Sequence, residues 1–100
     1  MKTRQEKRPK MISRHDFDKL FPDRAALEKF TGQQVEWFVN DAKNICGAID
    51  RERTERAWSY VVLKQNANGV LQVQELKENM KTEAEAEAEL FRKMETAETA

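Results

Sequence analysis

Few side chains in this chain are of the types that carry out covalent or metal chemistry. His15 is the only histidine and Cys46 the only cysteine among 100 residues. A general base needs a positioned partner and a pocket, so we interpret His15, beside acidic residues at the edge of a weak helical pattern, as an exposed surface histidine. No second histidine stands near Cys46 to activate it, which favours a small buried hydrophobe. The two residues are too few and too far apart in sequence for a zinc motif.

Three carboxylates form the other candidate group for chemistry. Asp41, Asp50 and Glu52 could approach one another across a hairpin, as acid/base pairs and sites for hard cations require. Turns and exposed connections collect such residues anyway, and we favour that interpretation. The three glycines are widely separated, so the sequence contains no phosphate-binding loop. We therefore predict a protein that is not an enzyme and has no catalytic residue, cofactor or metal site.

Arginines and aromatic residues supply the candidate interaction surface. The run RERTER contains arginines that could hold phosphates, and aromatic residues of nearby strands could stack on bases. Two glutamates interrupt the arginines, so local salt links in a solvated connection explain the run equally well. The candidate surface residues are Arg51, Arg53, Arg56, Trp37 and Tyr60.

Charge is balanced overall but unevenly distributed. Eighteen basic and eighteen acidic residues give zero formal net charge, although 36% of the chain is charged. Residues 1–14 contain six basic residues and one acidic residue, whereas residues 75–100 contain eight acidic and four basic residues. The total therefore favours neither nucleic acid nor a cationic partner, and the basic start keeps nucleic-acid binding as an alternative.

Two regions precede the expected sheet. Residues 1–12 combine charge with a proline and lack an apolar period, which predicts a disordered basic tail in which Met11 is a possible alternative start. Ser13 could cap a short helix whose apolar side chains share one face, and Pro22 would end it. A second short helix is expected over residues 24–30, closed by Gly32.

From Gln34 onward the apolar period changes to that of strands. Strand-like runs begin at Val35, Ile45, Trp58 and Val70, joined by links too short for parallel crossovers, which predicts an antiparallel meander. The strand from Trp58 is apolar on both faces and is expected to be central. The pair Asn68-Gly69 suits the hairpin that follows it.

The Ala/Glu-rich segment near the C-terminus is predicted to be a helix. Its alternation is formally that of a strand, but alanine and glutamate favour helices. Thr82 and Glu85 have the spacing of a capping box. A stripe of four apolar residues would pack on the sheet: Ala86, Leu90, Phe91 and Met94.

The predicted fold is α+β: a four-stranded antiparallel sheet meander with a C-terminal helix on one face, one or two short N-terminal helices and a disordered basic tail. Residues 13–95 would form the single domain, with a tail at 1–12 and a frayed end at 96–100. The apolar runs are too short to span a bilayer and one cysteine permits no intramolecular disulfide, so we expect a cytoplasmic protein with no membrane partner. The predicted function is a non-enzymatic interaction module that binds a protein partner or forms a homodimer. The alternative is a nucleic-acid-binding accessory protein that uses the arginine loop and the basic tail.

Overall fold

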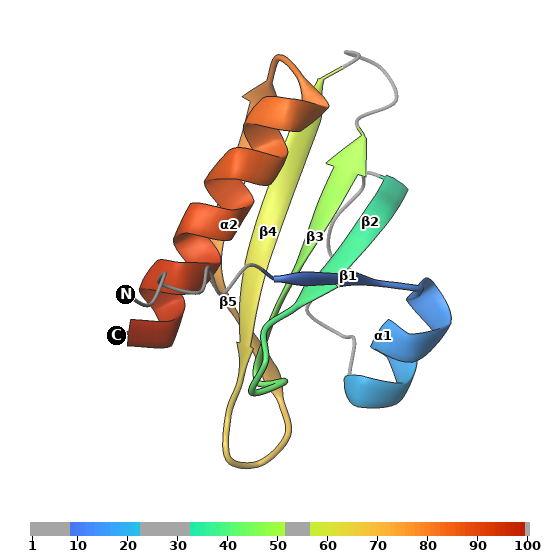
Figure 1. Ribbon diagram of the computed structural model, residues 1–100, viewed down its shortest axis with the longest axis vertical. Helices are drawn as coiled ribbons and strands as arrows, with labels where there is room; N and C mark the ends of the chain where they lie inside the picture. The colour runs from blue at the N-terminus through green and yellow to red at the C-terminus, as the bar shows by residue number, and fades with distance from the viewer. Residues whose placement is uncertain (1–8, 23–32, 52–56, 100) are drawn as a thin grey trace, which may run out of the picture.

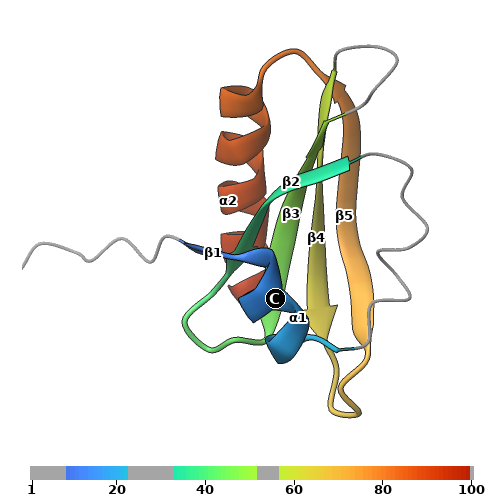
Figure 2. The same ribbon diagram turned by 90° about the vertical axis from the view of Figure 1, so that its right-hand side faces the viewer.

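The computed structural model describes residues 9–22, 33–51 and 57–99. In these residues, five antiparallel strands form one sheet in the order β1-β2-β3-β4-β5. The strands are β1 (Lys10–Ile12), β2 (Gln33–Val39), β3 (Ile45–Arg51), β4 (Trp58–Gln65) and β5 (Leu71–Met80). The helices are α1 (Arg14–Leu20) and α2 (Glu83–Thr99). Helix α2 lies along one face of the sheet, and α1 lies near β1 and β2 (Figures 1 and 2).

The predicted α+β class, antiparallel meander and C-terminal helix are confirmed, but the strand count was wrong. The additional strand in the described chain is β1, where Met11 pairs with Phe38 and Ile12 pairs with Trp37. These residues fall within the predicted disordered tail, which was expected from its charge, its proline and its lack of an apolar period. Pairing with β2 and packing of Ile12 against a buried apolar cluster decide their structure instead. Residues 1–8 and the helix predicted over 24–30 lie outside the described residues.

Local signals at the helix ends and at one turn are confirmed. The Ser13 hydroxyl oxygen accepts a hydrogen bond from the Asp16 backbone N–H at 3.1 Å, and Thr82 does the same for Glu85 at 3.1 Å. Both helices therefore begin at the predicted caps. Gly69 has a φ of +82°, as a tight hairpin requires. Helix α2 continues to Thr99, beyond the predicted fraying point, and buries the Ala97 side chain on the way.

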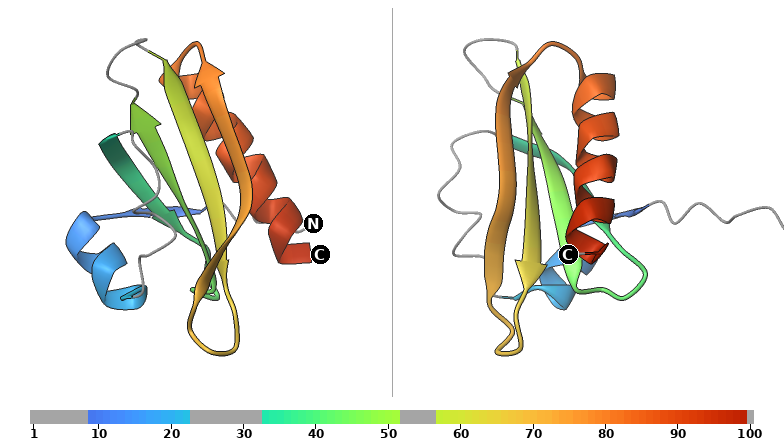
Figure 3. Two further views of the ribbon diagram at one scale, coloured as in Figure 1. Left: turned by 180° about the vertical axis from the view of Figure 1, so that it is seen from behind. Right: turned by 90° about the vertical axis from the view of Figure 1, so that its left-hand side faces the viewer.

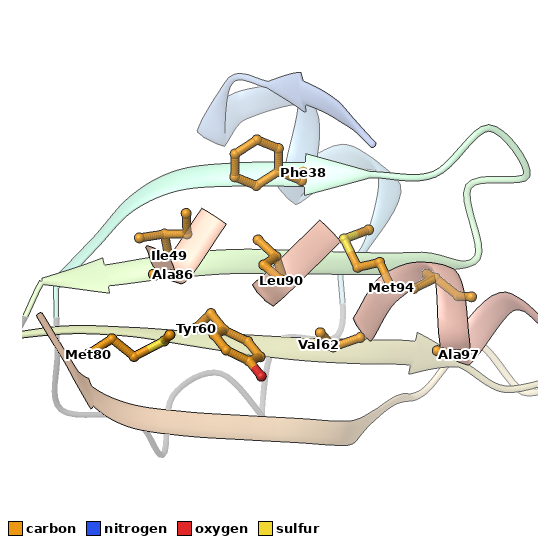
Figure 4. Packing of buried hydrophobic residues seen from close by; sticks show 10 residues of the cluster. Phe38, Ile49, Tyr60, Val62, Met80, Ala86, Leu90, Met94 and Ala97 are labelled. Atoms are coloured by element: carbon orange, nitrogen blue, oxygen red, sulfur yellow. The ribbon is translucent and has the colours of Figure 1, made fainter. Parts of the chain in front are cut away.

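The sheet has an apolar cluster on each face. We call the face under α2 the helix-covered face and the other the opposite face. The helix-covered cluster comprises Phe38, Ile45, Ile49, Tyr60, Val62, Met80, Ala86, Leu90, Met94 and Ala97 (Figure 4). The opposite cluster comprises Phe17, Phe21, Val39, Cys46, Ala48, Val61, Leu63 and Leu71. Alternate residues of a strand point to opposite faces, so β3 and β4 contribute to both clusters.

Gly47 on β3 allows α2 to approach the sheet closely. A Cβ atom at this position would lie 2.5 Å from Leu90 Cδ1, 3.2 Å from Met94 Sδ and 3.1 Å from the Val61 carbonyl oxygen. Gly47 pairs regularly with Phe38 and Val62, so it does not form a bulge. Gly47 therefore serves the close approach of the helix and not a change of register.

Replacing Gly47 with alanine should lower the free energy of unfolding by about 1–3 kcal/mol, because the added methyl group overlaps Leu90. Urea denaturation measures this cost. In a Leu90→Val background the side chain is shorter, so the same substitution should cost less. An equal cost in both backgrounds would show that contact with Leu90 is not the cause.

Candidate functional site

The two residues best suited to nucleophilic or acid/base chemistry differ in their exposure. His15 is exposed on α1, as predicted. Cys46 is fully buried in the opposite cluster, where burial raises the pKa of its thiol. The thiol therefore stays protonated at neutral pH, and Cys46 behaves as the small buried hydrophobe that the sequence indicated.

The candidate carboxylates do not gather in the described structure. Asp41 is exposed in the turn before β3, whereas Asp50 is buried near the far end of that strand, directly opposite Ser59 of β4. The strand rise separates the two ends of β3 by roughly 15–20 Å. Glu52 lies outside the described residues. Across residues 9–22, 33–51 and 57–99, no three histidine, cysteine, aspartate or glutamate side chains are grouped so that they could hold a metal ion.

Of the three candidate arginines, Arg51 alone lies within the residues that the structure describes. Arg51 is exposed at the end of β3, with its guanidinium carbon 5.8 Å from the centre of the Trp58 ring. This distance is within the range of a cation–π contact. Trp58 itself is half-buried at the start of β4 and packs against the helix-covered cluster. Arg53 and Arg56 lie outside the described residues.

The two aromatic candidates point to opposite faces of the sheet. Trp37 pairs with Ala48 and packs against the opposite cluster, whereas Tyr60 pairs with Ile49 in the helix-covered cluster. Tyr60 is wholly buried, and this burial, with added repulsion from Glu75 and Glu89, raises its pKa to about 12. Tyr60 therefore presents no surface to a partner, and the two rings cannot form one stacking platform.

A surface that we had not singled out lies along β5. Val73 and Leu76 are 44% and 42% exposed. Val73 pairs with Leu63 and Leu76 pairs with Val61, so both belong to the opposite face. We call Val73 and Leu76 the edge patch. Among the described strands, β5 pairs with β4 alone and borders the sheet, as the view from behind shows (Figure 3).

The middle of β5 contains a run of three regularly paired residues with an irregularity on each side. Glu75, Leu76 and Lys77 pair in turn with Val62, Val61 and Tyr60. The register shifts once between Val62 and Leu63 and again between Trp58 and Tyr60, and β5 supplies the extra residue each time. In the second irregularity Asn79 has a φ of +62°. The last strand of an open meander is an edge, so the sequence could have identified this edge but not the bulges.

Charged residues of β5 lie on the helix-covered face beside α2. The partners of Glu75 and Lys77 in β4 both belong to the helix-covered cluster, which places both charges on that face. Glu75 Oε2 lies 4.0 Å from Lys93 Nζ of α2, and both side chains are partly exposed. Such a long, solvated ion pair contributes little to stability.

A second charged group lies where β2 meets the start of α2. Burial raises the pKa of the Glu36 carboxyl above its ordinary value of 4.5, and the nearby carboxylates of Glu83 and Glu87 raise it further. A carboxyl whose pKa is raised by folding lowers stability once the pH exceeds its ordinary value. This contact therefore weakens the fold as the pH rises from 4.5 through the folded-state pKa.

Replacing Glu36 with glutamine should raise the free energy of unfolding near neutral pH by on the order of 0.5 kcal/mol, the size of a solvent-screened charge effect. At a pH below the ordinary pKa the gain should vanish, because the Glu36 carboxyl of the parent is then protonated in both the folded and the unfolded state. Urea denaturation at several pH values measures the difference. Glu85→Gln is the matched control, because Glu85 is exposed on the first turn of α2, which also contains Glu83. A pH-independent effect at Glu36 would show that packing, not charge, is responsible.

Comparison of the chain with protein-family models, with curated protein sequences and with solved structures gave no match. Neither helix of the described residues is long and apolar enough to cross a membrane. A proposal for function must therefore rest on the surface geometry of the chain.

Proposed function

We propose that the protein is a non-enzymatic interaction module that binds a protein strand along β5. The observation that carries this proposal is the edge patch: Val73 and Leu76 are exposed on β5, a ten-residue strand at the border of the sheet. The bound strand would come from a protein partner or from a second copy of the chain.

The physics of sheet edges supports strand addition. A border strand presents backbone N–H and C=O groups that a further strand can pair with, and side chains beside the edge add apolar contact. The helix residues Ala86, Leu90 and Met94 lie over β3 and β4 (Figure 4), so α2 packs mainly on these two strands and contacts β5 less extensively. The bulges limit regular pairing to a short stretch, which favours reversible rather than permanent binding.

The alternative, nucleic-acid binding, has less support. Arg51 contacts Trp58 of its own chain, and Trp37 and Tyr60 lie on opposite faces. Stacking platforms for bases need aromatic rings exposed along one groove. Binding of nucleic acid is therefore an outcome that would count against our proposal.

A peptide with the sequence of residues 70–80 should bind the protein at β5. In a titration followed by amide NMR, resonances of residues 71–77 should shift most, because the peptide adds a strand there. Leu76→Glu should weaken this binding, since it places a charge in the edge patch. The control is a peptide of the same composition in scrambled order. Shifts confined to α2, or none, would contradict the proposal.

A second titration tests the alternative. Labelled random duplex and single-stranded DNA should show no binding at physiological salt by fluorescence anisotropy, because the net charge is zero and acidic residues interrupt the arginines. Binding that weakens steeply with added salt, together with no response to the peptide, would overturn the proposal in favour of nucleic acid.

A further inference from the structure

We infer that the strand bound along β5 is the β5 of a second copy, paired antiparallel about a two-fold axis that passes between the Leu76 residues of the two copies. This inference rests on the proposed function and specifies its partner. A two-fold interface uses the same surface on both copies, so the surface must be complementary to itself. The central three residues of β5 meet this requirement.

Charge complementarity is the first argument. In antiparallel pairing centred on Leu76, Glu75 lies opposite Lys77 of the second copy, and Lys77 lies opposite its Glu75. Residues opposite one another in a ladder point to the same face, and Glu75 and Lys77 both lie on the helix-covered face. The pairing therefore creates two cross-strand ion pairs of opposite sign.

Apolar contact on the other face is the second argument. Leu76 points to the opposite face, where 42% of it is exposed. A two-fold axis between the two copies of Leu76 places these side chains opposite each other, each beside Val61 of its own β4. An exposed apolar surface of the monomer would thus be buried in the dimer.

Neighbouring registers are unfavourable, which is the third argument. Centring the pairing on Glu75 places two glutamates opposite each other, and centring it on Lys77 places two lysines opposite each other. An axis midway between two adjacent residues would pair side chains that lie on opposite faces of the sheet. Among registers centred between Glu75 and Lys77, the one on Leu76 alone pairs opposite charges.

The arrangement of the helices leaves room for this dimer. The axis is perpendicular to the sheet, so both copies of α2 lie on the same face. Each helix lies mainly over β3 and β4 of its own chain (Figure 4), so the axis at the outer edge of β5 places the two helices on opposite sides of the interface. The bulges on either side of residues 75–77 keep the new ladder short, so the dimer should be weak and reversible.

Charge reversal tests the register directly. Sedimentation velocity over a concentration series should show self-association of the full-length parent. Glu75→Lys and Lys77→Glu should each weaken it by roughly tenfold, because each places like charges opposite one another twice. An equimolar mixture of the two variants should associate again, as should the double variant, since opposite charges then face each other.

Lys93→Ala is the matched control. It removes the contact between Lys93 and Glu75 within one chain and leaves β5 unchanged, so its self-association should equal that of the parent. The melting temperature of every variant verifies that it is folded.

Several results would overturn the inference. Unchanged association of both single variants would place the interface elsewhere, as would a mixture that fails to associate again. A parent that stays monomeric at every concentration would exclude the dimer. If the parent stays monomeric but binds the residue 70–80 peptide, the proposed function stands with a different partner. If the parent neither self-associates nor binds the peptide, both proposals are refuted.

Discussion

Leu90 and Met94 of α2 lie directly on the bare backbone of Gly47, and this close contact fixes which part of the sheet the helix covers. Because Gly47 is in β3, the helix packs closely on β3 and β4, and it also contacts β5. A larger residue at this position would lift the helix and open the helix-covered cluster. The position of α2 therefore determines which strands remain available at the surface.

The opposite face has a different cover and a different consequence. Phe17 and Phe21 are completely buried there, and α1 contacts β2, toward the end of the sheet formed by β1. Among the described elements, α2 covers the centre of one face and α1 covers the β2 side of the other. Neither helix reaches the β5 side of the opposite face, where Val73 and Leu76 remain exposed. The edge patch is thus a consequence of where the two helices pack.

Much of this architecture could be predicted because its signals are local. The caps at Ser13 and Thr82 and the hairpin at Gly69 are set by residues a few positions apart, and each prediction was confirmed. Strand β1 could not be predicted, because Ile12 becomes part of a strand only through distant residues of β2. The faces of the candidate aromatic residues depend on register across several strands, and register is not encoded locally. The exposure of β5 likewise depends on where two distant helices pack.

The same features that make β5 available also restrict what can bind it. A long flat edge strand pairs indiscriminately, and natural proteins limit this with bulges and charges. β5 has both, yet its charges alternate in sign around Leu76 instead of repeating one sign. Charges of one sign would repel an identical strand, whereas the alternating charges of β5 place opposite charges together when two copies pair centred on Leu76. In the proposed dimer, the bulges would limit extended pairing and the alternating charges would favour one symmetric contact.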